Sequence, residues 1–139
     1  MSINRRRMTR RALSLVALVL VGVGIATHDL PALTQDTAAS VRLTLDYGDG
    51  VQKSFTALPW KEKMTVFDAL QAAENHPRGI KLAFVGRGES VFITAIDDKA
   101  NEGANGPNWR YTVNDQPARY SAGVMELKAG DAVVWRFAK

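Results

Sequence analysis

Cysteine is absent from this sequence of 139 residues, and histidine occurs only twice, at His28 and His76. Without cysteine there is no disulfide, no thiolate metal site and no cysteine nucleophile, so an exported domain must rely on its own core. No Ser/His/Asp order typical of hydrolases stands out, and an acid–base pair would have to consist of two carboxylates. The adjacent Asp97 and Asp98 would point to opposite sides of a continuing strand. We therefore predict that the protein is not an enzyme.

An excess of basic charge is also lacking once the N-terminus is set aside. The chain has 18 Lys and Arg against 14 Asp and Glu. Five of the basic residues lie near the N-terminus, at Arg5, Arg6, Arg7, Arg10 and Arg11. From residue 27 onward, 13 basic residues face all 14 acidic ones, so this part carries a formal charge of about −1. We expect no nucleic-acid partner, because nucleic-acid binding depends on a basic surface.

The arginine cluster runs into an apolar segment at residues 12–25. This segment is long for the hydrophobic region of a signal peptide and shorter than the roughly 18 to 20 residues of a spanning helix. We predict a signal peptide at residues 1–26, cleaved after Ala26, or else an uncleaved N-terminal membrane anchor. The stretch "TRRALS" also resembles a loose twin-arginine signal. The protein is expected to be exported, either periplasmic or secreted, or anchored to the inner membrane through this segment alone.

The remainder is predicted to form a flexible tether at residues 27–40 and a single domain at residues 41–139. The tether has small and polar residues without periodicity. Residues 41–46 alternate strictly between apolar and polar, which predicts a half-buried strand. The turn "YGDG" and the returning strand at residues 51–58 complete a hairpin.

A helix is predicted at residues 65–75. Thr65 can cap its N-terminus, and Asp68 stands three residues later, where a capping box places its acidic residue. One apolar stripe along the helix would face a sheet. The stripe consists of Val66, Ala69, Leu70 and Ala73.

Four further strands are expected after the helix. Residues 80–84 and 91–97 are joined by the turn "VGRGES", and the second of them, apolar on both faces, is expected to be central. Beyond a polar loop at residues 98–108, the alternation in residues 109–113 places Trp109 and Tyr111 on one face. In the last strand, the same alternation places Val133, Trp135 and Phe137 on one face. The elements predict an α+β fold with one mostly antiparallel or mixed sheet packed on one main helix.

Five segments in this order resemble the transcobalamin-like C-terminal domain family: "VRLTLDYGDG", "MTVFDALQAA", "ITAIDD", "NWRYTVNDQPA" and "LKAGDAVVWRF". The resemblance implies a β-grasp fold related to the soluble-ligand-binding β-grasp domains. It also implies a cobalamin-like corrinoid as ligand, because the related domain of vitamin B12 carriers covers the upper face of the corrinoid. The large helical domain of those carriers has no counterpart here. The turn usually written Asn-Gly in the family is Asn114-Asp115 in this chain.

The candidate ligand-binding residues lie in and around the strand at residues 109–113. Aromatic rings offer much contact area at little entropic cost, so these side chains could line a shelf for a planar ligand, or they could belong to the core. Asn114 has a simpler explanation as a turn residue, because Asn and Asp tolerate the left-handed conformation. The candidate residues are Asn108, Trp109, Tyr111, Asn114 and Tyr120.

Other features favour structural explanations. The loop "DDKANEGANGPN" holds oxygen ligands that calcium accepts, but its spacing does not match an EF-hand. His76 ends the helix next to a proline, where a histidine favours helix termination. The turn "GRGES" is not followed by a helix and forms no phosphate cradle. We therefore predict no metal site.

The sequence leads to two functional hypotheses. The first is an exported, non-catalytic domain that binds a small ligand, with a corrinoid implied by the resemblance. The second is a module that docks another envelope protein or a polymer through a loop or an exposed sheet edge, with no small-molecule ligand.

Overall fold

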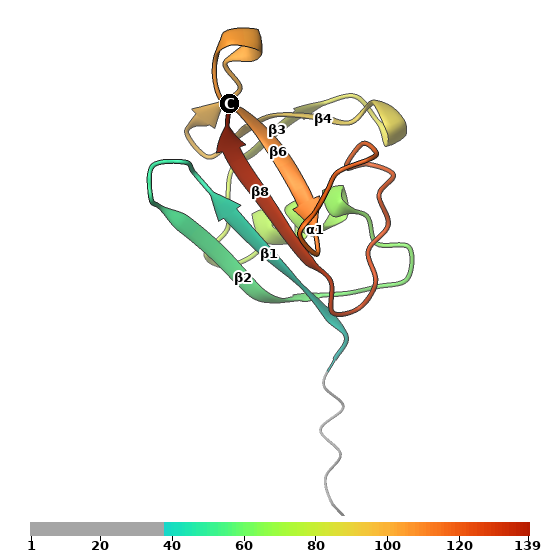
Figure 1. Ribbon diagram of the computed structural model, residues 1–139. Coiled ribbons are helices and arrows are strands. Elements are labelled where there is room, and N and C mark those ends of the chain that lie inside the picture. The colour runs from blue at the N-terminus through green and yellow to red at the C-terminus, as the bar shows by residue number, and fades with distance from the viewer. Residues whose placement is uncertain (1–37) are drawn as a thin grey trace, which may run out of the picture. The chain divides into compact units, whose positions relative to one another are not determined.

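A computed structural model describes residues 38–139, and the predicted leader at residues 1–26 and most of the predicted tether lie outside the described residues. Figure 1 shows a mostly β structure with one α-helix, which agrees with an α+β class. The part of the chain that the structure describes contains no helix long and apolar enough to span a membrane. The elements are β1 (Ser40–Asp46), β2 (Gln52–Pro59), α1 (Val66–Glu74), β3 (Leu82–Val85), β4 (Phe92–Ile96), β5 (Lys99–Ala100), β6 (Asn108–Val113), β7 (Gln116–Pro117) and β8 (Ala132–Ala138), with short 3-10 helices at Gly88–Ser90 and Gly103–Asn105.

The larger sheet has five strands in the order β2-β1-β8-β6-β7. β1 and β8 run parallel at its centre, and the other neighbours are antiparallel (Figure 1). β1 begins at Ser40, inside the predicted tether, and the carbonyl of Ala39 accepts a hydrogen bond from Trp60 N at 2.9 Å. The first and last strands of the domain, β1 and β8, are paired from Arg42 and Ala132 to Asp46 and Arg136.

The β1–β2 hairpin forms as the alternation predicts. Val41, Leu43 and Leu45 are fully buried, and their neighbours along β1 are less so. In the connecting loop, Gly48 has a φ of +75°, and a Cβ there would lie 2.4 Å from the carbonyl oxygen of Phe137. Glycine is needed at this position, because any side chain would push β8 away from the loop.

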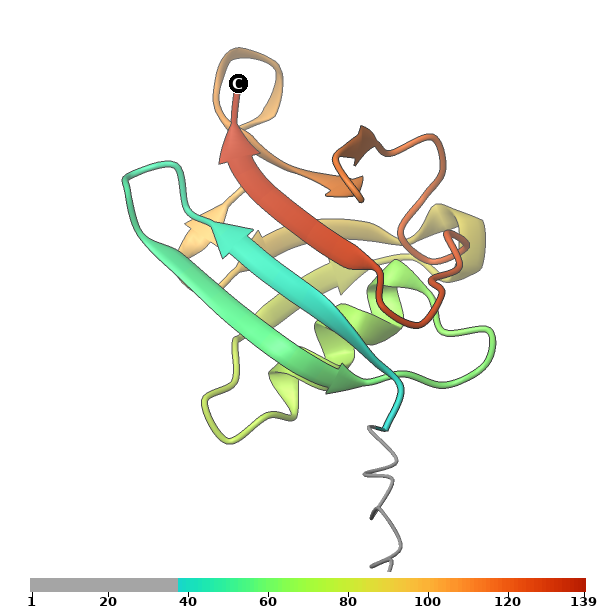
Figure 2. The same cartoon turned by 60° about the horizontal axis from the view of Figure 1, so that its bottom comes forward.

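The helix α1 confirms the predicted capping box. The Thr65 hydroxyl accepts from Asp68 N at 3.1 Å, and the Asp68 carboxylate accepts from Thr65 N at 2.8 Å. The predicted apolar stripe is buried. Figure 2 shows that α1 lies behind the five-stranded sheet, on the same side as β3 and β4.

The prediction of one sheet was wrong, because β3, β4 and β5 form a separate antiparallel sheet in that order. β4 is central, as expected, but only within this smaller sheet, and Phe92 is exposed on it. The strand predicted at residues 91–97 ends at Ile96, because Asp97 has a φ of 52° and turns the chain back into β5.

The strands β6 and β8 carry the predicted aromatic faces. Trp109, Tyr111 and Val113 are buried and alternate with less buried residues. Asn114 and Asp115 both have positive φ, at 49° and 63°, as a two-residue hairpin turn requires. On β8, the predicted face of Val133, Trp135 and Phe137 is buried.

A candidate ligand cavity between β4 and β6

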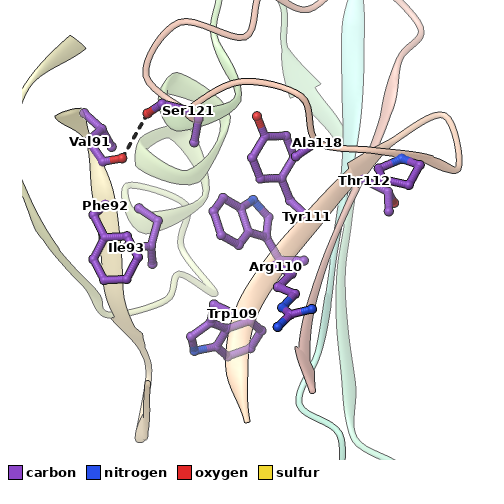
Figure 3. Close-up of a pocket in the computed structure, with 12 residues that line it drawn as sticks. Val91, Phe92, Ile93, Trp109, Arg110, Tyr111, Thr112, Ala118 and Ser121 are labelled. Carbon is purple, nitrogen blue, oxygen red and sulfur yellow. Dashed lines mark hydrogen bonds between the residues drawn. The ribbon is translucent and has the colours of Figure 1, made fainter. Parts of the chain in front are cut away.

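A cavity of about 450 Å³ lies between β4 of the smaller sheet and β6 of the larger one. Figure 3 shows Ile93 on β4 and Val91 just before it, with Trp109 and Tyr111 on the strand that faces them. The segment that follows β7 passes over one end with Ala118 and Ser121. The lining residues are Val91, Phe92, Ile93, Trp109, Arg110, Tyr111, Thr112, Pro117, Ala118, Ser121, Ala122 and Trp135.

Three aromatic side chains form the floor of the cavity. β6 directs Trp109 and Tyr111 inward, because successive side chains alternate along a strand. Tyr111 is paired with Trp135 of β8, and their ring centroids are 4.9 Å apart. Trp109 packs edge-on against Tyr47 at 5.6 Å. The same aromatic residues therefore serve the core and line the cavity.

Hydrogen bonds to the backbone hold the walls in place. Trp109 Nε1 donates to the carbonyl of Lys99 at 2.8 Å, and the Tyr111 hydroxyl donates to the carbonyl of Tyr120 at 2.6 Å. Ser121 Oγ donates to the carbonyl of Val91 at 2.9 Å and so ties the covering segment to the start of β4. Desolvation raises the pKa of the Tyr111 phenol above its ordinary value.

The polar loop after β5 links the two strands that face each other across the cavity. The Asn101 side chain donates to the carbonyl of Ile93 at 2.8 Å and accepts from Trp109 N at 2.8 Å, so it bridges the two facing strands. Asn108, a predicted ligand-binding residue, hydrogen-bonds to both the N–H and the carbonyl of Gly103. In the structure, this loop is organised by its own amide side chains.

Asn114 and Tyr120, also predicted as ligand-binding residues, lie away from this cavity. Both line a separate hollow of about 350 Å³. The Asn114 side chain there donates to Asp131 at 2.8 Å and accepts from Ala132 N at 2.9 Å, which fixes the turn to the start of β8. Tyr120 is 66% exposed. Of the predicted residues, only Trp109 and Tyr111 meet in the main cavity.

Val91, Ile93, Ala118 and Ser121 were not predicted for the site. The strand at residues 91–97 is apolar on both faces, and nothing local indicates that Ile93 faces β6. Ser121 and Val91 are 30 positions apart, and only the tertiary fold joins them.

A cluster of polar side chains lies just after the end of β1, around Tyr47. The Tyr47 hydroxyl donates to Asp97, whose other oxygen accepts from Lys81 N at 2.8 Å. Burial, followed by the hydrogen bond to Asp97, raises the pKa of Tyr47. Asp97, predicted as the last residue of a strand, lies just beyond the end of β4 and anchors a turn.

Potential metal ligands are dispersed. Among residues 38–139, no group of three or more His, Cys, Asp and Glu side chains is arranged to hold a metal ion. His76 accepts a hydrogen bond from Arg78 N at 3.1 Å through Nδ1, and its ring packs edge-on against Phe55. These contacts give His76 a structural role at the end of α1.

Comparison with known proteins gives a family and a fold. Residues 64–139 match the model of a family described as a domain of unknown function, DUF4430. None of the curated proteins matches the chain. A crystal structure from Ruminococcus gnavus, described as that of "a putative metal binding protein", is similar with a TM-score of 0.58 and 16% sequence identity. The similarity covers 73% of this chain and 97% of the other, and at this identity it concerns the fold alone.

Proposed function

The chain belongs to the DUF4430 family, and we propose that it binds a small, mainly apolar molecule in the cavity between β4 and β6. One observation supports this function above the others. The cavity holds about 450 Å³ and is lined largely by aromatic and aliphatic side chains. Sites for small molecules in proteins are typically apolar hollows of roughly 300 to 1,000 Å³ with a few fixed polar groups.

The proposed activity is binding without catalysis. Three residues with hydroxyl groups line the cavity, Tyr111, Thr112 and Ser121, and the hydroxyls of Tyr111 and Ser121 each donate to a backbone carbonyl. A nucleophile needs a neighbouring base within hydrogen-bond reach, and these two hydroxyls are directed to carbonyl oxygens instead. The site is therefore suited to hold a molecule rather than to transform it.

The connectivity supports a β-grasp assignment. A hairpin is followed by a helix, and the first and last strands run parallel at the centre of the sheet. Together with the resemblance to transcobalamin-like domains, this makes a corrinoid the first natural ligand to test. A corrinoid is larger than a cavity of this volume, so it would insert an edge or a side group between β4 and β6.

Export is part of the same proposal. The arginine cluster and the apolar segment at residues 12–25 favour a signal peptide or an anchor. A binding domain without cysteine would function in the periplasm, outside the cell, or tethered to the inner membrane.

A titration with a matched pair of variants tests the ligand cavity. Ala118 is exposed and lines the cavity, whereas Ala104 is exposed and does not. We expect the wild-type protein and Ala104→Phe to show saturable quenching of tryptophan fluorescence with hydroxocobalamin or an apolar aromatic probe. Ala118→Phe should weaken binding of the same ligand at least tenfold, because its ring occupies part of the cavity. Equal affinities in the two variants would contradict the assignment.

A second candidate function is favoured by the surface of the smaller sheet. Phe84 is 40% exposed, and Val85 and Phe92 are each 57% exposed. Val85 and Phe92 are cross-strand partners, and β3 is an edge strand of that sheet. Exposed apolar side chains beside a free edge are typical of sites where a partner adds a strand. Docking of an envelope protein gains support if no ligand saturates the cavity.

A further inference from the structure

We infer that the cavity between β4 and β6 takes one apolar residue of a short peptide in extended conformation, held by hydrogen bonds to the backbone of β6. This ligand class rests on the proposed ligand-binding function. It narrows the ligand from an apolar molecule to one that carries peptide groups.

The part of β6 beside the cavity has no strand on the side that faces β4. In residues 38–139, β7 pairs only with Thr112 and Val113 of β6, and β5 pairs only with Ala95 and Ile96 of β4. The lining of the cavity includes four consecutive residues of β6, from Trp109 to Thr112. Successive side chains point to opposite faces of a strand, so a cavity that meets four residues in a row lies alongside the backbone.

On this side, the backbone of β6 presents one free acceptor and one free donor. Trp109 N donates to the Asn101 side chain, and the carbonyl of Tyr111 accepts from Ala118 N at 3.1 Å. The N–H and C=O of one residue in a strand point to the same side, so the Trp109 carbonyl and the Tyr111 N–H also point away from β8. Neither group has a hydrogen-bond partner in the part of the chain that the structure describes. Unpaired groups along a strand are the groups to which a further strand binds.

The Asn101 side chain shows that an amide group fits between the two strands. It donates to the carbonyl of Ile93 and accepts from Trp109 N, each at 2.8 Å. A backbone peptide group carries the same C=O and N–H pair and can join two strands in the same way. The fold therefore fills one position between β4 and β6 with an amide. The neighbouring position, beside the carbonyl of Trp109 and the N–H of Tyr111, borders the cavity.

The free stretch of β6 has the length of one peptide residue, because Asn101 occupies the N–H of Trp109 and Ala118 N occupies the carbonyl of Tyr111. One residue in extended conformation directs its own N–H and C=O to the same side. Its N–H would donate to the Trp109 carbonyl, and its C=O would accept from the Tyr111 N–H.

The walls of the cavity suit an apolar side chain on that residue. The rings of Tyr111 and Trp135 both line the cavity, and their centroids are 4.9 Å apart. Aromatic rings of this kind favour a further aromatic ring as a neighbour. When a peptide binds along a strand, main-chain hydrogen bonds supply affinity, and a pocket for a side chain supplies specificity. A phenylalanine residue with both ends capped is the simplest ligand that meets both conditions.

The matched probes are N-acetyl-phenylalanine N-methylamide and its ester analogue, in which an oxygen atom replaces the N–H of phenylalanine. The two have nearly the same shape, and only the first can donate to the Trp109 carbonyl. We expect the amide to bind the wild-type protein about tenfold more tightly than the ester, the ratio that one net hydrogen bond supports.

A ¹H–¹⁵N correlation spectrum reports the second hydrogen bond. Both probes should move the backbone N–H signal of Tyr111 downfield, because both carry the carbonyl that accepts from it. The N–H of Thr112 is the internal control, because it points toward β8, and its signal should move much less.

Equal affinities of the two probes, or a Tyr111 N–H signal that moves no more than that of Thr112, would overturn the peptide ligand. Naphthalene, an apolar probe without a peptide group, separates this failure from a failure of the proposed function. If naphthalene alone moves the signals of β4 and β6 in a saturable manner, the cavity binds apolar molecules and the peptide ligand is wrong. If none of the three compounds moves these signals, both the peptide ligand and the proposed function are wrong.

Discussion

At the scale of single residues, the aromatic side chains of β6 both pack in the core and line the cavity. Trp109 was open to two interpretations from the sequence, as a core residue or as an exposed shelf. The structure buries it to 6% exposure and still includes it in the wall of the cavity. Alternation along a strand predicts which face is buried, but it does not reveal whether the far side of that face is filled with atoms or left hollow.

Trp109→Ala should lower the free energy of unfolding by about 3 to 5 kcal/mol, because it removes a buried ring that packs on Tyr47 and Phe137. Urea unfolding followed by circular dichroism measures the change. Tyr120→Ala is the control, because this tyrosine is 66% exposed, and its loss should change the value by less than about 0.5 kcal/mol. A small effect at Trp109 would show that the ring is not part of the core.

At the scale of elements, the local signals were sufficient for the helix and the hairpin turns. Thr65 and Asp68 predicted the start of α1, and Asn114 and Asp115 predicted the turn after β6. The division into two sheets was missed, and so were the partners of Asp97, since Tyr47 and Lys81 are 50 and 16 positions away along the chain. Such pairings across the chain leave no local pattern.

Thr65→Ala should lower the free energy of unfolding by about 1 kcal/mol, because it removes the side chain that caps α1. Thr65→Ser retains the hydroxyl and should stay within a few tenths of a kcal/mol of the wild type. Thermal or urea unfolding of the three proteins gives the comparison. If the serine and alanine variants lose the same stability, the capping hydrogen bond is not the cause.

At the scale of the whole molecule, Asp46 connects three segments of the larger sheet. Its carboxylate lies at the end of β1, accepts from Gly48 N at 3.0 Å in the β1–β2 loop, and pairs with Arg136 of β8 at 3.0 Å. The hydrogen bond from Gly48, followed by that from Arg136, lowers the pKa of Asp46 in the folded protein. A carboxylate with a lowered pKa stabilises the fold above its unfolded pKa of about 3.9.

That contribution is present at neutral pH and is lost as the pH falls from about 4 through the lower pKa of the folded state. The variant Asp46→Asn has no carboxylate at this position and lacks the contribution at every pH. It should therefore be less stable than the wild type at pH 7, and the difference in the free energy of unfolding should narrow toward pH 3. Urea unfolding across this range measures both curves. If the free energies of unfolding of the two proteins change with pH in parallel, Asp46 does not contribute to the loss of stability in acid.

The cavity is a property of the whole molecule, because its walls come from both sheets and from the segment after β7. The sequence predicted Trp109 and Tyr111 for the site and missed the facing wall of Val91 and Ile93. The missing half depends on how β4 approaches β6, which follows from the packing of two separate sheets.

The most direct test of ligand binding is a backbone ¹H–¹⁵N shift map of the protein, titrated with a small apolar aromatic ligand. We predict that the amides of residues 91–93, 109–112 and 117–122 move in a saturable manner, while those of β2, on the far edge of the larger sheet, remain in place. Shifts spread evenly over the domain, or confined to the exposed residues of β3, would contradict a ligand cavity between β4 and β6.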